Sequence, residues 1–102
     1  MLKSRRFETD FVERALYLNE ANPSAALRFV NAAEEAIDLL ARFPEMGPVW
    51  RYGPPEHPTW YLLVPGFHHY LIFYRYEEEE VRLGRLLHGA MDLRDVLSDG
   101  SA

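Results

Sequence analysis

The chain has 102 residues, of which 48% are apolar and 26% are charged, and its formal net charge is −5. This length suits one ordinary domain, and this composition excludes a disordered chain. The absence of cysteine excludes disulfides and zinc sites built on thiolates, and no apolar run approaches the roughly 20 residues that span a bilayer. The lack of cysteine and of a spanning run fits a cytoplasmic protein, and we expect no contact with a membrane. Because the negative charge opposes binding to a nucleic-acid backbone, we also expect no direct nucleic-acid binding.

The first predicted elements are a short strand and an amphipathic helix. Residues 2–7 are mixed in character and favour a short strand. Thr9 can cap a helix over residues 10–20, and Asp10 in its first turn suits the positive end of the helix dipole. The apolar side chains of this helix recur at helical spacing; they are Phe11, Val12, Ala15, Leu16 and Leu18.

A second, longer helix is predicted over residues 23–42. Asn22 is a good capping residue, and Pro23 is tolerated at the first helical position. The helix should end before Pro44. Its core face steps by four and three residues along Ala26, Val30, Ala33, Ile37 and Leu40. The short connection between the two helices favours an antiparallel helical hairpin.

Three strands are predicted in the C-terminal half, over residues 59–64, 67–76 and 81–88. The turns between them fall at Pro65-Gly66 and at the four glutamates Glu77 to Glu80. Short turns between consecutive strands indicate antiparallel pairing.

These elements predict an α+β fold of order β-α-α-β-β-β, with the antiparallel helical hairpin packed on a mainly antiparallel sheet of four to five strands. The segment over residues 43–58 is rich in proline and glycine and can hold at most a short edge strand at 49–52. We expect one domain over residues 1–95 and a flexible tail over residues 96–102.

The predicted strand over residues 67–76 is apolar on both faces, as a central strand covered on two sides would be. It carries more apolar surface than one layer of helices can cover, and Trp50, Trp60 and Tyr61 add to this surface. Either the proline-rich segment and the tail cover the second face, or a partner polypeptide does. We expect an exposed apolar groove that requires a partner.

The four histidines do not predict a metal site. His68 and His69 are neighbours on a strand and point to opposite faces, so they cannot bind one metal ion by themselves. His88 could join one of them across the sheet, but the sequence offers no clear third ligand, and His57 lies in the proline-rich segment. We expect no metal and no cofactor.

A metal-free ribonuclease is an alternative that the residue types allow. Cleavage of RNA needs a general acid, a general base and cations on the phosphate. His88 and Tyr74 could serve as acid and base, with cations from Arg75, Arg82 and Arg85. The simpler interpretation is that Tyr74 packs in the sheet and the arginines are solvated or pair with the glutamates, and the net charge of −5 favours it.

Four motifs in order resemble the RelE/ParE toxin superfamily, and the ParE branch most closely. They are Asn22-Pro23-Ser24-Ala25-Ala26, Pro44-Glu45-Met46-Gly47, the strand from His69 to Arg75, and the run from Val81 to Ala90. The resemblance covers residues 5–95. The chain departs from the RelE pattern because residues 89–102 contain no tyrosine, histidine or lysine. It also has Met91 where members often have arginine, and it is acidic where members are commonly basic.

The resemblance implies the toxin of a type II toxin–antitoxin system. Its partner would be a ParD-like antitoxin of the ribbon-helix-helix class, and its target DNA gyrase, which ParE-like toxins inhibit by protein binding without a catalytic residue. The alternatives are a RelE-like, ribosome-dependent mRNA endoribonuclease and a non-toxic member that only binds its antitoxin.

Two sets of site residues follow from the resemblance. The antitoxin-binding residues are expected on the helical hairpin and the sheet edge: Phe11, Leu18, Phe29, Trp60 and Tyr61. The target-binding residues are expected on the last strand and the tail: Arg82, Arg85, His88, Met91, Asp92 and Arg94.

Overall fold

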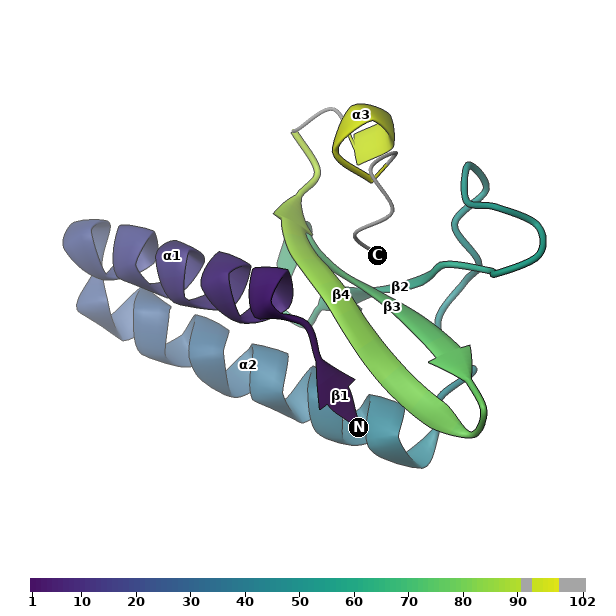
Figure 1. The fold of residues 1–102 in the computed structure, drawn as a ribbon. Coiled ribbons are helices and arrows are strands. Elements are labelled where there is room, and N and C mark those ends of the chain that lie inside the picture. The colour runs from purple at the N-terminus through teal and green to yellow at the C-terminus, as the bar shows by residue number, and fades with distance from the viewer. Residues whose placement is uncertain (91–92, 98–102) are drawn as a thin grey trace.

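The computed structural model describes residues 1–90 and 93–97. Two long helices lie together against one face of a four-stranded sheet, and a short third helix lies near the opposite face (Figure 1). The helices are α1 (Arg5–Ala21), α2 (Pro23–Arg42) and α3 (Leu93–Leu97). The strands are β1 (Leu2–Lys3), β2 (Trp60–Val64), β3 (Phe67–Glu77) and β4 (Glu80–His88). The predicted α+β fold and its element order are confirmed.

The sheet has the strand order β1-β4-β3-β2. Strand β3 pairs antiparallel with both β2 and β4, as predicted. Strand β1 is the exception, because it lies parallel to β4 with Leu2 opposite Arg82. The chain between these two strands contains the helical hairpin, β2 and β3, so the parallel pairing is made by a long connection.

Helix α1 begins five residues earlier than predicted. Ser4, not Thr9, is its N-cap: the Ser4 hydroxyl accepts the Phe7 amide at 3.0 Å and donates to the Gly84 carbonyl at 2.8 Å. The predicted strand over residues 2–7 is therefore wrong beyond Lys3. The early start places Phe7 on the buried face of the helix. Helix α2 has the predicted bounds, and the Asn22 side chain accepts the Ala25 amide at 3.1 Å.

The main core lies between the helical hairpin and the sheet. Alanines on the buried face of α2 allow close approach of the strands, and Ala33 and Ala36 are fully buried. Aromatic rings fill the rest: Phe29 packs edge-on against Tyr70 and Phe67, with ring centroids 5.1 and 5.4 Å apart. Buried Leu40, Val64, Ile72, Tyr74, Leu83 and Leu86 complete this cluster.

The second face of the sheet is covered by the chain itself. Leu71, Phe73 and Leu87 are buried there, under Trp50 and Tyr61 and under the apolar residues of α3. The expected groove that needs a partner on this face is therefore wrong. Of the two coverings considered, the proline-rich segment together with α3 is the one observed.

The proline-rich segment is anchored to the sheet by few backbone bonds. Trp50 donates to the Thr59 carbonyl at 2.6 Å and Tyr61 donates to the Pro48 carbonyl at 3.0 Å. The expected strand at 49–52 is reduced to a single bridge between Val49 and Trp60. Residues 93–97 form α3, which crosses the expected boundary between domain and tail at residue 95.

The β3–β4 hairpin turns through two residues in the left-handed region, with φ of 54° at Glu78 and 61° at Glu79. This is the backbone that a two-residue hairpin requires, and asparagine or glycine usually occupies it. The predicted glutamate turn is confirmed. None of the helices in the described ranges is long and apolar enough to cross a membrane.

Candidate functional site

The expected target-binding residues of β4 are spread along the strand. Arg82, Arg85 and His88 are spaced three residues apart, so the strand rise separates the first from the last by roughly 20 Å. They therefore do not form one cluster, and each has a different environment.

Arg85 is held by a carboxylate of α1. Its Nε and Nη2 donate to the two oxygens of Asp10 at 2.7 and 3.1 Å, and the backbone amide of Leu86 donates to the same carboxylate at 3.0 Å. The side chains of Asp10 and Arg85 are each only 14% exposed. Asp10 therefore satisfies the free edge of β4 and fixes α1 against it, and Arg85 takes part in this structural contact.

His88 lies at the end of β4 among aromatic rings. Its ring stacks on His69 with centroids 5.7 Å apart and meets the Tyr70 ring edge-on at 4.9 Å. Its Nδ1 accepts the Ala90 amide at 3.0 Å. Because an accepting Nδ1 carries no proton, this contact requires the neutral imidazole with its proton on Nε2.

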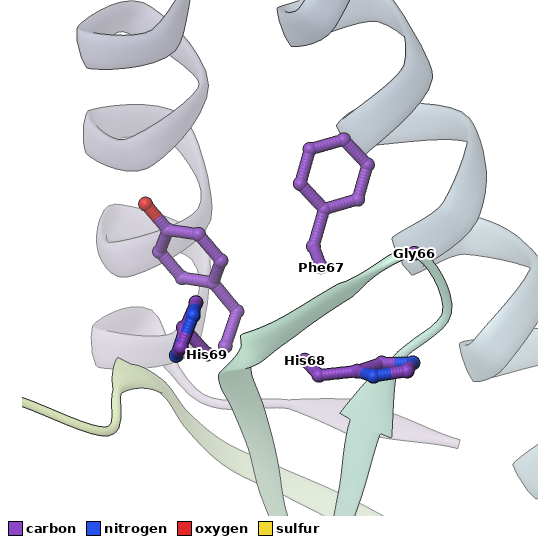
Figure 2. Close-up of a pocket in the computed structure, with 5 residues that line it drawn as sticks. Gly66, Phe67, His68 and His69 are labelled. Atoms are coloured by element: carbon purple, nitrogen blue, oxygen red, sulfur yellow. The ribbon is translucent and has the colours of Figure 1, made fainter.

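The other two histidines of this region point apart. A hollow at the start of β3 is lined by Gly66, Phe67, His68, His69 and Tyr70. Figure 2 shows Phe67 directed toward the helices, with the rings of His68 and His69 on opposite sides of the strand. Residues 1–90 and 93–97 contain no group of three potential metal ligands.

Arg94 of α3 lies over the ring of Tyr52, 4.3 Å from its centroid, and Arg51 lies 5.0 Å from the same centroid. This cation–π contact joins α3 to the proline-rich segment. Arg94 therefore belongs to the cover of the second sheet face. Met91 and Asp92, the remaining expected target-binding residues, lie outside the described residues.

The residues of the ribonuclease alternative do not converge. Tyr74 is fully buried under the helices, where its hydroxyl accepts the Gly47 amide at 3.2 Å, and burial raises the pKa of this phenol. Arg75 follows it on the strand and so points to the opposite face. Arg85 is bound to Asp10. Within the described part of the chain, these three side chains therefore cannot act on one phosphate.

The expected antitoxin-binding residues are all buried or half-buried in the isolated chain. Phe29 is 0% exposed, so it belongs to the core and its assignment to a binding surface is corrected. Phe11 and Leu18 are half-buried and pack against that core. Trp60 stacks on Tyr74 with centroids 6.3 Å apart, and Tyr61 packs in the cluster on the second face.

The sequence matches a known protein family over most of its length. Residues 2–93 match the family described as ParE toxin of type II toxin-antitoxin system, parDE. The chain belongs to the ParE toxin family. A comparison with curated proteins finds no match. Membership makes the chain a toxin of a toxin–antitoxin pair, with an antitoxin as its partner, and ParE toxins generally act by protein binding.

The helical hairpin also carries exposed apolar residues that were not among the expected site residues. Val12 and Leu16 lie one turn apart on α1 and are 55% and 60% exposed, and Leu27 on α2 is 63% exposed. The sequence could have indicated these exposed residues, because the apolar stripe of α1 is wider than the face that the core buries. Only its Phe11 side packs on the core.

Proposed function

We propose that this chain is a toxin that inhibits DNA gyrase by binding it in the cytoplasm, and that a ParD-like antitoxin neutralises it. The match to the ParE family over residues 2–93 carries this proposal. The environment of Tyr74 supports a mechanism without catalysis, because a buried phenol with a raised pKa is a poor acid–base group.

The antitoxin site is proposed at the outer surface of the helical hairpin. Leu16 lies six residues before the Asn22 connection and Leu27 five residues after it, so the two lie level with each other near the tip of the hairpin. Val12 is a third exposed apolar side chain, and we propose these three as the antitoxin surface. An amphipathic antitoxin helix is the partner that this surface fits, since two apolar residues one turn apart match the spacing of helical anchors. Phe11 and Leu18, which are half-buried, pack against the main core beside this surface.

The target site is proposed at the end of the sheet that carries the last strand and α3. His88 offers a half-buried ring there, whereas Arg82, a half-buried cation, lies near the other end of β4. Arg82 would therefore contact only a target that extends along the strand. Arg85 acts indirectly, because its bond to Asp10 holds β4 against α1. Arg94, Met91 and Asp92 complete the proposed set.

Expression of the chain alone in bacteria tests the function. We expect growth to stop, with DNA breaks and an SOS response while mRNA stays intact, and we expect the purified chain to inhibit supercoiling by gyrase. Cleavage of mRNA before DNA damage would support the ribonuclease, and unimpaired growth the non-toxic member. Co-expression of a neighbouring gene with a ribbon-helix-helix start should restore growth.

The antitoxin surface has its own test. Leu16→Glu places a charge in the exposed apolar surface and should weaken antitoxin binding at least tenfold, because a central apolar contact typically contributes about 1–2 kcal/mol or more. Toxicity in the absence of antitoxin should persist. Ala41→Glu adds the same charge at the far end of α2, where the residue is also exposed, and should leave binding unchanged. Equal binding by both variants would exclude this surface.

A further inference from the structure

Two arginines face each other on the side of the sheet that points away from the helical hairpin. Arg75 of β3 and Arg82 of β4 are directly opposite in the antiparallel register. Their neighbours Tyr74, Val81 and Leu83 pack in the core under the helices. Because side chains alternate along a strand, both arginines extend from the other face.

The two guanidinium groups lack an adequate partner within the described residues. The Nε atoms of Arg75 and Arg82 are both buried, and neither makes a hydrogen bond. The carboxylate nearest to Arg75 is that of Glu77, and its Oε1 is 3.9 Å from Arg75 Nη1, beyond hydrogen-bond distance. That Glu77 oxygen is itself buried without a hydrogen bond. Buried donors without acceptors are costly, and like charges opposite each other destabilise a sheet.

The charge of this pair indicates the ligand that would satisfy it. Glu80, which also neighbours Arg82, is already paired with the amino terminus at 2.7 Å. The two arginines and Glu77 therefore leave a single net positive charge, which one monoanion would neutralise. A polyanion would meet the remaining glutamates of the hairpin turn, Glu78 and Glu79, which are exposed next to the pair. A carboxylate is planar and accepts two parallel hydrogen bonds from a guanidinium, so it matches the unpaired donors.

We propose that Arg75 and Arg82 form a binding site for a single carboxylate group. The group comes either from a small free acid or from an aspartate or glutamate side chain of another polypeptide. The site lies on the opposite side of the sheet from the helical hairpin. It shares Arg82 with the proposed target site, but binding of a carboxylate can be measured without any target.

Nuclear magnetic resonance of the full-length chain tests the site. The side-chain Nε–H signals of Arg75 and Arg82 are followed during addition of sodium acetate, with sodium chloride at equal ionic strength as the reference. We expect saturable shifts with acetate and none with chloride. Arg82→Gln should weaken acetate binding about tenfold or more, since one charge-assisted contact is lost. Arg28→Gln, at an exposed arginine of α2, should leave it unchanged.

The source of the carboxylate is distinguished with two blocked peptides that differ only in one glutamate or glutamine. Tighter binding of the glutamate peptide than of acetate would assign the site to a polypeptide, and equal binding to a small acid. Arg75→Gln provides a second variant if Arg82→Gln does not fold. Unresponsive Nε–H signals, or equal shifts with chloride, would overturn the proposal and leave an adventitious ion only.

Discussion

The two faces of the sheet are covered in different ways. The face under α1 and α2 is sealed by two regular helices whose aromatic and aliphatic residues fill a continuous core around Phe29 and Tyr74. The other face is sealed by Trp50 and Tyr61 and by the short helix α3 over a smaller cluster. The first cover is held by many buried side chains, whereas the second depends on a few. We therefore expect stability to come mainly from the hairpin side.

Truncation of a side chain in the core under the helical hairpin should have the largest effect on stability. Phe29→Ala should lower the free energy of unfolding by about 3–5 kcal/mol, because it removes a fully buried ring and leaves a cavity. Leu97→Ala, in the half-buried cover on the other face, should cost about 1 kcal/mol. Urea unfolding measures both. Similar losses for the two variants would refute the difference between the faces.

Gly47 connects the two covers, and its replacement should have the next largest effect. A Cβ at this position would overlap the Tyr61 carbonyl and lie 2.9 Å from the Tyr74 hydroxyl. Gly47→Ala should destabilise the chain by about 1–3 kcal/mol, as overpacking does, and should loosen the proline-rich segment. Thermal unfolding measures the loss. Gly66→Ser is a control without steric overlap, although its φ of 78° makes some strain unavoidable.

The buried phenol of Tyr74 should make stability depend on alkaline pH. Burial raises its pKa above 10.0, so folding favours the neutral phenol. This stability is fully present below pH 10 and is lost as the pH rises through the raised pKa. Urea unfolding between pH 7 and 11 should show this loss, and Tyr74→Phe should reduce it. Tyr17→Phe, which changes an exposed ring, should leave the pH dependence unchanged.

A glycine in the turn that joins β3 and β4 should have the smallest effect on the free energy of unfolding, and should raise it. Glu79 adopts a φ of 61°, which costs a residue with a side chain about 1–2 kcal/mol. Glu79→Gly should therefore stabilise the chain by about 0.5–1 kcal/mol after the entropic penalty of glycine. Glu34→Gly, in the middle of α2, should instead destabilise it by about 1 kcal/mol. A loss of stability in both variants would contradict the turn geometry.

The hairpin side of the fold was predictable because its information is local. Asn22-Pro23 marks the start of α2, and the apolar period marks its buried face. The start of α1 could not be predicted, because Ser4 and Thr9 can each serve as the N-cap of a helix. Ser4 is selected by a bond to Gly84, 80 positions away.

The second cover and much of the candidate site depend on contacts without a local pattern. Residues 43–58 have no period that shows which side chains will pack, so Trp50 could not be placed. The partner of Arg85 is 75 positions distant, and nothing in its neighbourhood indicates Asp10. Phe29 and Leu16 are both apolar residues of amphipathic helices, and only tertiary packing separates the buried one from the exposed one.

The chain's own cover over Leu71, Phe73 and Leu87 bears on how long a liberated toxin would last. Antitoxin that is degraded would leave behind a molecule whose sheet is already shielded from water on both sides. Recovery from growth arrest would then be set by the rate at which fresh antitoxin is synthesised, and not by decay of the toxin.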